Sequence, residues 1–511
     1  MTDAIIVVGA GPVGLTVALE LARRDVPVRI VDRLEAPTTE SRAILVHSRS
    51  LEMLDRIGLV DEVIASGVRT DAMELHANGG KLARIELGVV DSPYPYSVTT
   101  AQTETERILT AALATHGVTV DRGVTLTALT QDDSGVRATV RHADGHEEEL
   151  TGSWLVGADG GHSEVRHQIG AALAGSFKGE RFLMGDVNAT HDLDPHTMYT
   201  FFSPHDGPLL VFPMRGDRVR LIAQVATTAD GPATVEWLQR VVDERSDQPI
   251  AIRDTRWLTT FDIHHAQVPQ YRAGRVFLAG DAAHIHSPAG GQGMNTGIQD
   301  AFNLGWKLAL AATGEAGPAL LDSYHAERHP VGAKVIEFTT QLTRVGTVAN
   351  PIVQKLRNTV AHAATALAPV QQAMADKVEE TALAYRGSPV VIPAPGRAQL
   401  TGGDHLPDAG PALRAALARE DGHVLLTVAA PGGPLPTAAK SGARQILLSL
   451  APEATAPGFD ASVPDPDGHA AARFGLPRGG RVMVRPDGYV ALVTSLDDEA
   501  PLRAYEELLH G

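Results

Sequence analysis

The chain has 511 residues, 43% of them hydrophobic and 21% charged, which is enough for two or three domains with their own cores. The 61 acidic residues outnumber the 44 lysines and arginines, and the net charge of −17 argues against a nucleic-acid partner or a polybasic membrane contact. The absence of cysteine excludes disulfides, thiolate metal sites, iron–sulfur clusters and thiol catalysis.

The N-terminal segment is apolar but does not resemble a targeting signal. Glu20 and three glycines interrupt it and no basic segment precedes it, so a signal peptide is not expected. No run of about 18 apolar residues occurs elsewhere, so no membrane span and no membrane partner are expected. These features predict a cytoplasmic protein.

An apolar run, a glycine-rich turn, a helix and a second apolar run open the chain. Residues 4–8 predict a buried strand, the turn at 9–14 begins a helix that reaches about Arg23, and a second strand covers 26–31. This βαβ unit is typical of the start of a doubly wound parallel sheet, so we expect an α/β fold.

The turn has the spacing of a dinucleotide-binding loop. Gly9 permits the tight bend, Gly11 lets a pyrophosphate approach the backbone, and Gly14 lets helix and strand pack closely. The helix N-terminus adds amides and partial positive charge, and Asp32 follows the second strand, where it can accept hydrogen bonds from a ribose. This motif alone does not distinguish NAD from FAD.

The middle of the chain changes from buried-strand to alternating patterns. Strand-like runs occur at 136–142 and 153–159. The stretch from about 178 to 267 alternates and is rich in aromatic residues, which predicts an antiparallel sheet. The next predicted elements are a buried strand at 275–281, a helix at 295–312 and an Ala-rich helical segment at 331–386.

A Pro/Gly-rich stretch at 388–411 marks a domain boundary. Beyond it, short strands alternate with helical segments and predict a small α/β domain. No cofactor-type motif lies after residue 309, so the cofactor site is expected to be independent of this last domain.

Two more glycine-rich motifs follow strand-like runs. The segment 157–166 reads GADGGHSEVR, and the segment 280–284 reads GDAAH, with Asp281 emerging from a strand end. A further glycine loop at 290–293 leads into another helix N-terminus, so the set suits a long ligand with a pyrophosphate and an extended flavin ring. Either later motif alone is also compatible with a capped turn, but a plain NAD dehydrogenase would leave both unexplained.

Together these motifs resemble those of the single-component, class A FAD-dependent aromatic hydroxylases. The most similar branch contains pentachlorophenol monooxygenase, phenol hydroxylase and the aromatic polyketide hydroxylases. The resemblance covers nearly the whole chain and is most specific in LAGDAAHIHSPAGGQGMNTGIQDAFNLGWKLA. The matching segments are 31–54, 100–109, 278–309 and 320–332.

The resemblance implies an FAD-binding Rossmann-like domain with an inserted antiparallel-sheet substrate domain and a C-terminal thioredoxin-like α/β domain. The FAD-binding domain with its helical extension would comprise 1–177 and 268–387, and the substrate domain 178–267 with a contribution from 71–101. The thioredoxin-like domain would comprise 395–511 and has no cysteines.

The resemblance also implies which residues hold FAD and, transiently, NAD(P)H. Asp159 would serve both cofactors, with Arg166 nearby. The other implied FAD residues are Gly9, Gly11, Pro12 and Gly14 at the pyrophosphate, Asp32 and Arg33 at the adenosine, Arg42 near the phosphates, Gln102 at the flavin, Asp281 at the ribityl and pyrophosphate region, and Pro288, Gly291, Gly293, Met294 and Asn295 beside the isoalloxazine.

One position departs from the family pattern. Phenol hydroxylases carry an aspartate that helps to ionise the substrate, and Ile44 fills that place here. His47 is the nearest candidate for a replacement catalytic base, with a packed histidine as the alternative. The middle sheet supplies candidates for the substrate pocket, each also compatible with a core role. They are Tyr199, Phe201, Phe212, Met214 and Arg220.

The family resemblance implies an enzyme that hydroxylates an electron-rich aromatic ring through a flavin C4a-hydroperoxide, with NAD(P)H and O₂ as co-substrates. The ring would be a phenol, hydroxypyridine, quinol or polyketide-type polycycle, and no metal is expected. Alternatives are epoxidation, Baeyer–Villiger or dehalogenating oxidation, and a flavoprotein that binds an aromatic compound without turnover. The choice between NADH and NADPH, and self-association into a homo-oligomer, stay open.

Overall fold

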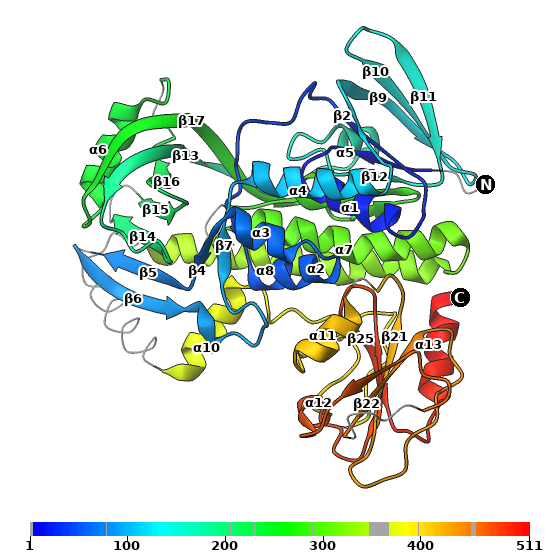
Figure 1. The fold of residues 1–511 in the computed structure, drawn as a ribbon. Helices are drawn as coiled ribbons and strands as arrows, with labels where there is room; N and C mark the ends of the chain where they lie inside the picture. The colour runs from blue at the N-terminus through cyan, green and yellow to red at the C-terminus, as the bar shows by residue number, and fades with distance from the viewer. Residues whose placement is uncertain are drawn as a thin grey trace.

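Helices and strands alternate along the described parts of the chain and gather around three main sheets (Figure 1). This mixed architecture confirms the predicted α/β class. The structure is a computed structural model that describes residues 4–77, 79–203, 207–227, 231–287, 290–346, 367–396, 398–418, 420–450 and 456–510.

The N-terminal βαβ unit builds a six-stranded sheet in which all neighbours but one pair are parallel. The predicted strands of the three glycine-rich motifs lie side by side in it, so their carboxyl ends meet at one edge. In spatial order the strands are β18 (Arg272–Ala273), β19 (Val276–Leu278), β12 (Leu155–Gly157), β1 (Ile5–Val8), β2 (Val28–Asp32) and β8 (Val120–Arg122).

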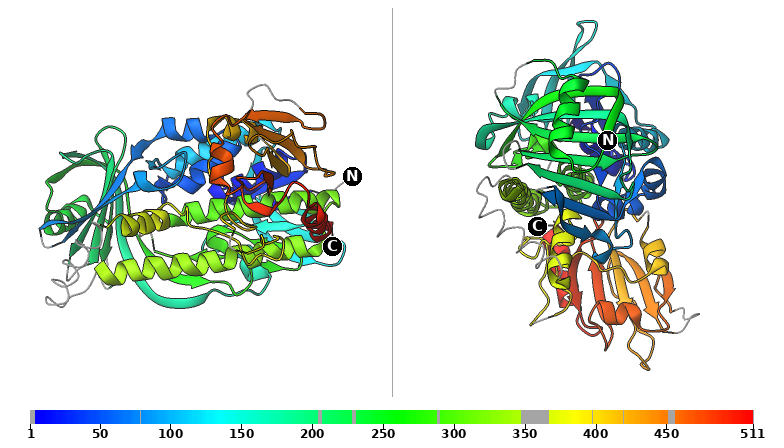
Figure 2. Two further views of the ribbon diagram at one scale, coloured as in Figure 1. Left: turned by 90° about the horizontal axis from the view of Figure 1, so that it is seen from below. Right: turned by 90° about the vertical axis from the view of Figure 1, so that its left-hand side faces the viewer.

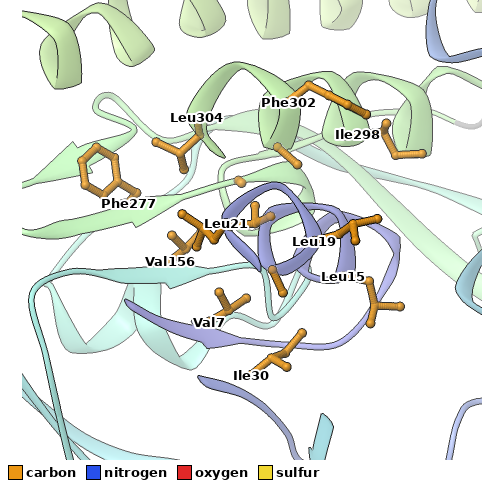
Figure 3. Packing of buried hydrophobic residues seen from close by; sticks show 14 of the residues in the cluster. Val7, Leu15, Leu19, Leu21, Ile30, Val156, Phe277, Ile298, Phe302 and Leu304 are labelled. Carbon is orange, nitrogen blue, oxygen red and sulfur yellow. The ribbon is translucent and has the colours of Figure 1, made fainter. Parts of the chain in front are cut away.

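Helix α1 (Pro12–Ala22) packs between this sheet and the long helix α7 (Gln292–Thr313), as Figure 3 shows. Both helices are apolar on most of their surface because each is covered from two sides. The labelled core side chains are Val7, Ile30, Val156 and Phe277 from the strands, Leu15, Leu19 and Leu21 from α1, and Ile298, Phe302 and Leu304 from α7.

A second sheet, of eight strands, is formed mainly by the aromatic-rich middle of the chain. Its neighbours are antiparallel except for the parallel pair β14–β5. In spatial order the strands are β20 (His284–Ile285), β17 (Ile250–Gln267), β13 (Ala174–His191), β16 (Arg218–Val225), β15 (Gly207–Pro213), β14 (Thr197–Ser203), β5 (Ala72–Ala77) and β6 (Gly80–Glu86).

Strand alternation gives this sheet two apolar faces. One face packs against α6 (Val235–Arg245), a helix that the sequence patterns did not predict. The other face packs against the segment Ile44–Leu45 and against α10 (Ala368–Val378), so it is turned toward the parallel sheet and its helices.

The C-terminal part of the chain forms a five-stranded sheet with flanking helices. It packs against α7 and the start of α8 (Pro318–Gly346), whereas the far end of α8 reaches the eight-stranded sheet (Figures 1 and 2). In spatial order its strands are β23 (Ala461–Pro464), β22 (Arg444–Ser449), β21 (Val424–Val428), β24 (Gly480–Val484) and β25 (Val490–Thr494), and its helices are α11 (Pro411–Leu417), α12 (His469–Arg473) and α13 (Ala500–His510).

Two small sheets and the remaining helices complete the described fold. None of the helices in the described ranges is long and apolar enough to cross a membrane. These elements are β9 (Val124–Gln131), β10 (Val136–His142) and β11 (Glu147–Gly152) in one sheet, β3 (Leu45–Val46), β7 (Ser97–Thr99) and β4 (Val68–Thr70) in the other, the helices α2 (Ser48–Arg56), α3 (Val60–Ser66), α4 (Gln102–Thr115) and α5 (Glu164–Gln168), and the short 3₁₀ turns η1 (Leu87–Val89) and η2 (Gly280–Ala282).

Candidate active site

A cleft of about 360 Å³ opens at the carboxyl edge of the parallel sheet. It brings together several of the residues predicted to bind the cofactor, from the ends of β1 and β2, the loop between β2 and β3, the start of α4 and the turn after β12. These are Gly9, Gly11, Asp32, Arg33, Arg42, Gln102 and Asp159. Thr38, Glu40, Glu106, Arg122 and His162 also line it, although none of them was among the predicted cofactor residues.

The glycines of the first turn have different surroundings. Gly9 has φ +103°, and a Cβ at Gly14 would lie 1.9 Å from the carbonyl oxygen of Gly9, so both positions are closed to larger residues. A Cβ at Gly11 would have nothing within 4 Å, because its backbone borders the open cleft. Pro12 begins α1 at a position where an N–H would have no partner within the helix, so the lack of an N–H in proline costs no hydrogen bond there. The loop thus exposes backbone where a pyrophosphate would approach.

Asp32 closes the loop and borders the cleft. Its Oδ2 accepts a hydrogen bond from Ala10 N at 2.6 Å, and its Oδ1 accepts one from Leu34 N at 2.8 Å. The guanidinium of Arg122, at the end of β8, lies 3.5 Å from Oδ1. Arg122 could have been found from the rule that ligands bind at the carboxyl ends of parallel strands.

Gln102 ties the start of α4 to the loop that borders the cleft. Its Oε1 accepts from Ala43 N at 3.0 Å, and its own backbone N donates to Ser41 Oγ at 2.8 Å. Its Nε2 donates to Glu106 Oε1 at 2.8 Å. Desolvation raises the pKa of the Glu106 carboxyl. Both polar ends of Gln102 are therefore engaged in holding this wall of the cleft.

Asp159 and Arg166 hold the turn after β12. Asp159 accepts from Ser163 Oγ at 2.5 Å and from the backbone N–H groups of Glu164 and Val165, at 2.7 and 3.1 Å. Its carboxylate therefore caps α5 while also lining the cleft. The buried Arg166 donates from Nη1 to the carbonyl of Ala282 at 3.1 Å, which fastens this turn to the third motif.

Asp281 follows β19 and is exposed to solvent. Among the described residues no group donates a hydrogen bond to its carboxylate. Gly280 before it has φ +58°, and a Cβ there would lie 2.8 Å from Val13 Cγ2. The turn thus presses against α1 and presents a carboxylate that lacks a partner.

Comparisons with known proteins agree with this geometry. The family described as FAD binding domain matches residues 1–339. The chain is 34% identical over 524 residues to 6-methylpretetramide 4-monooxygenase of Streptomyces rimosus, an alignment that covers 99% of this chain and 93% of that protein. It is 38% identical over 342 residues to pentachlorophenol 4-monooxygenase of Sphingobium chlorophenolicum, covering 66% of this chain and 63% of that one.

The solved structure of OxyS anhydrotetracycline hydroxylase from Streptomyces rimosus matches with a TM-score of 0.78 at 29% identity, over 100% of this chain and 99% of that one. The chain belongs to the FAD-dependent aromatic monooxygenases. This confirms the predictions of an enzyme, of FAD as cofactor with NAD(P)H as reductant, and of hydroxylation of an aromatic compound. The similar proteins do not favour the alternative oxidations or a protein that only binds its ligand.

The residues of the monooxygenase fit FAD on structural grounds. The backbone at Gly11 borders open space, which suits a pyrophosphate. The space beside Gly9 and Gly14 is already occupied by protein atoms. The unpartnered carboxylate of Asp281 suits ribityl hydroxyl groups, because a carboxylate is a hydrogen-bond acceptor only. Arg33 and Arg42 add positive charge to the cleft that Gly11 borders.

The first turn of α7 is fastened to the segment before α2. Asn295 donates from Nδ2 to the carbonyls of Leu45 and Gly291, both at 2.9 Å, and its Oδ1 accepts from His47 N at 2.9 Å. Gly291 caps the helix with φ +66°. Gly293 and Met294 lie in the same turn. Pro288 lies outside the described residues.

His47 is buried with both ring nitrogens engaged. Nε2 lies 2.9 Å from the carbonyl of Gly290, and Nδ1 lies 2.7 Å from Ser97 Oγ, which donates to Glu379 Oε1 at 2.6 Å. Burial opposes a charge on His47, but Glu379, 3.7 Å away, outweighs that effect and raises the pKa of His47. The same contact lowers the pKa of Glu379 despite its desolvation. No motif in the sequence connected Glu379 to this loop.

The candidate pocket residues divide between the two faces of the large sheet. Tyr199 and Phe201 pack with the cluster that faces α6, away from the parallel sheet. Phe212 and Met214 belong to the opposite cluster, together with Ile44. Strand periodicity puts each pair on one face but does not say which face is which.

Arg220 is fully buried between the large sheet and the loop beside the cleft. Its Nη2 donates to Asp186 Oδ2 at 3.0 Å, and its Nη1 points to the carbonyls of Arg42 and Ala43 at 3.4 Å. The guanidinium also lies 5.2 Å from the ring of Trp257. Its visible contacts are with protein, and they brace the 42–43 backbone.

No group of His, Asp or Glu side chains in the described part of the chain is arranged to hold a metal ion. The histidines near the third motif have other partners. His284 Nε2 lies 2.8 Å from Asp300 Oδ2, and desolvation lowers the pKa of His286 to about 4.

Proposed function

We propose that the monooxygenase hydroxylates a polycyclic phenol of the aromatic polyketide type. The observation that carries the proposal is the apolar face that the large sheet turns toward the FAD-binding sheet. Its large apolar residues at the margin retain partial exposure although they pack against the buried cluster. These are Phe202, Trp257 and Phe261 from the sheet, Phe338 from α8 and Met374 from α10.

The extent of this face argues for a flat ligand larger than one ring. It is contributed by the sheet, by α8 and by α10, so a ligand touching all three needs an extended apolar surface. The relative that matches along nearly its whole length acts, by its name, on 6-methylpretetramide. The shorter match to pentachlorophenol 4-monooxygenase covers 66% of this chain.

Bound FAD, reduced by NAD(P)H, supplies the activated oxygen that is transferred to the ring. Gly11, Asp32, Arg42 and Asp281 would hold the cofactor, and Asn295 would fix the first turn of α7 beside it. The apolar face excludes water from the reacting centre, which protects the activated oxygen from wasteful decay.

No carboxylate is available to deprotonate the substrate where phenol hydroxylases have one. Ile44 is buried among Phe212, Met214 and their neighbours, so this wall of the pocket is apolar. His47 is engaged with Gly290 and Ser97, which favours a positioning role over that of a base. The substrate would therefore bind as an already ionised or intrinsically acidic phenol.

The division into domains is also proposed. The FAD-binding domain would comprise 1–177 and 268–387, and the substrate domain 178–267 with 71–101, since β5 pairs with β14. The domain at 395–511 would be thioredoxin-like, which its mixed sheet supports, with β21, β22 and β23 parallel and β24 and β25 antiparallel.

The test is a panel of phenols with one to four fused rings, given to the FAD-loaded enzyme with NAD(P)H. We expect NAD(P)H oxidation coupled to a product heavier by one oxygen atom for the polycyclic phenols. Single-ring phenols should give slow oxidation that produces mainly H₂O₂. Equal coupling for phenol and for the polycyclic compounds would contradict the proposal.

A matched pair of variants separates the substrate face from the opposite face. Phe212→Leu changes the cluster that faces the FAD-binding sheet, and Phe201→Leu changes the cluster that faces α6. Both residues are buried, so both variants should lose similar stability. Only Phe212→Leu should raise KM for the polycyclic phenol. An equal rise in both variants would count against this face as the substrate site.

A further inference from the structure

The C-terminal domain meets α7 and α8 through a buried ion pair. Arg485, beside β24, donates from Nη1 and Nη2 to the two carboxylate oxygens of Glu327 on α8, at 2.7 and 2.9 Å. Lys307 of α7 donates from Nζ to the same carboxylate at 2.7 Å. All three side chains are fully buried. Such a pair fixes a geometry, because removing one partner leaves a buried charge without compensation.

Two further residues complete this group and balance its charge. Asp487 accepts from Arg485 Nε at 3.0 Å, and Asn303 of α7 donates to Glu327 Oε2 at 2.6 Å. Two cations thus face two carboxylates, and Ser388 Oγ also donates to Glu327 Oε1 at 2.5 Å. Desolvation lowers the pKa of Lys307 to about 8 against the opposing effect of Glu327. The arrangement depends on Arg485, since without it the group carries an excess negative charge.

The next residue of α8 connects this group to the cofactor site. Arg328 donates from Nε to Asp300 Oδ1 at 2.6 Å and from Nη2 to the carbonyl of Thr296 at 3.0 Å. Asp300 Oδ2 accepts from Gly280 N at 3.1 Å and contacts His284. Thr296 lies in the first turns of α7, so Arg328 holds both the α7 N-terminus and the turn that presents Asp281.

Apolar contacts follow the same route. Trp306 of α7 is fully buried, with the Arg485 guanidinium 5.2 Å from its ring and His423 of the C-terminal domain packed edge-on at 5.4 Å. Leu425 and Met483 of the C-terminal sheet belong to the same cluster. The C-terminal domain therefore packs against the middle of α7, and the first turn of the same helix adjoins the cofactor site.

We propose that Arg485 and Glu327 are positioning residues for FAD, through which docking of the C-terminal domain and binding of FAD stabilise each other. The motifs alone predict a cofactor site that is independent of the C-terminal domain. The contacts along α7 indicate instead that the cofactor site depends on it. The coupling is reciprocal: if docking raises FAD affinity, FAD must strengthen docking by the same factor.

The variant that tests the coupling is Arg485→Met, which keeps much of the side-chain length but removes the charge. We expect the dissociation constant of FAD to rise tenfold or more, with part of the loss restored in Arg485→Lys. The matched control is Arg473→Met, because Arg473 also makes an ion pair from the C-terminal domain to the rest of the chain, with Asp91 of segment 71–101 at 2.6 Å, but in a solvent-exposed place. FAD affinity in this control should stay within twofold of wild type.

Hydrogen exchange separates this coupling from a general loss of stability. In Arg485→Met, the amides of residues 291–300 should exchange faster, while those of β15 and β16 in the eight-stranded sheet should be unchanged. Unchanged FAD affinity in a folded Arg485→Met protein with faster exchange at 480–494 would overturn the proposal, because docking would then be lost without effect on the cofactor.

The wild-type protein gives the reciprocal test, which decides the matter even if Arg485→Met does not fold. Exchange at 480–494 is compared in the apoprotein and after addition of FAD, with α6 (235–245), on the face of the large sheet turned away from the parallel sheet, as the internal reference. We expect FAD to slow exchange at 480–494 but not at 235–245. The absence of any slowing at 480–494, in protein shown to have bound FAD, would overturn the proposal.

Discussion

At the scale of single residues, Asp281 and Asp159 show that the aspartates of two similar glycine-rich turns can have different roles. One is free to bind a ligand, and the other holds the protein's own backbone. Asp281 is exposed and has no donor among the described residues, whereas Asp159, the aspartate of the other glycine-rich turn, accepts three hydrogen bonds from its own turn. His47 has partners on both nitrogens. Asp281 has no partner within the protein, so we expect its substitution to affect ligand binding more than protein stability.

Asp281→Ala should therefore weaken FAD binding without destabilising the apoprotein. A hydrogen bond to a charged group contributes about 1.5–3 kcal/mol, so the dissociation constant should rise by one to two orders of magnitude. Fluorescence titration of the apoprotein with FAD measures this. Asp262→Ala, which removes an exposed partner of Arg181, is the control and should leave FAD affinity unchanged. Wild-type affinity in Asp281→Ala would show that another group carries this contact.

His47 should make stability depend on pH. Glu379 raises its pKa above the ordinary value of 6.5, so folding takes up a proton. The resulting stabilisation is full below pH 6.5 and is lost as pH rises through the raised value. His47→Gln should then cost more stability at about pH 6 than at about pH 9 in urea unfolding of the apoprotein. The exposed His116→Gln is the control, and an equal cost of His47→Gln at both pH values would rule out a charged His47.

At the scale of elements, the glycine turn and α1 offer a pair of changes with opposite consequences. In Gly14→Ala the added Cβ would lie 1.9 Å from Gly9 O, so helix and strand must separate and the apoprotein should lose about 1–3 kcal/mol or more. In Gly11→Ala nothing lies within 4 Å of the added Cβ, so apoprotein stability should fall by about 1 kcal/mol at most. FAD affinity should nevertheless drop at least tenfold. Unimpaired FAD binding in Gly11→Ala would show that the pyrophosphate lies elsewhere.

The elements that carry motifs could be predicted from the sequence, and those held by distant contacts could not. Residues 4–8 and 9–14 have a local pattern that leads to β1 and α1, and the helix predicted at 295–312 is α7. Helix α6 lies outside any motif and was missed. Glu379, which partners His47 from far along the chain, has no sequence signal because the pairing exists only in the folded state.

The substrate candidates show a limit of a different kind. Alternation along a strand places Tyr199 with Phe201 and Phe212 with Met214, but the choice of face depends on which neighbour covers the sheet. Here α6 covers one face of the large sheet, and the segment Ile44–Leu45 with α10 covers the other. A β-strand pattern therefore narrows the candidates to pairs, and only tertiary packing selects between them.

At the scale of the whole molecule, charges buried between the C-terminal domain and α7–α8 make separate unfolding costly. Opening this interface exposes the apolar surface around Trp306 and separates Arg485 from Glu327. A domain that is held only by exposed pairs such as Arg473–Asp91 would instead unfold on its own. Which of the two kinds of contact holds the domain determines whether the protein unfolds in one thermal transition or two, and which transition FAD shifts.

We therefore expect the FAD-loaded enzyme to unfold in a single calorimetric transition. Because FAD binds the folded state alone, FAD at about a hundred times its dissociation constant should add about 3 kcal/mol and move the entire heat peak upward. In Arg485→Met the peak should divide in two, with only one part responding to FAD, while Arg473→Met should keep one peak. Two transitions in the wild-type enzyme, one of them insensitive to FAD, would mean that the C-terminal domain unfolds independently, since a ligand shifts only the cooperative unit to which it is coupled.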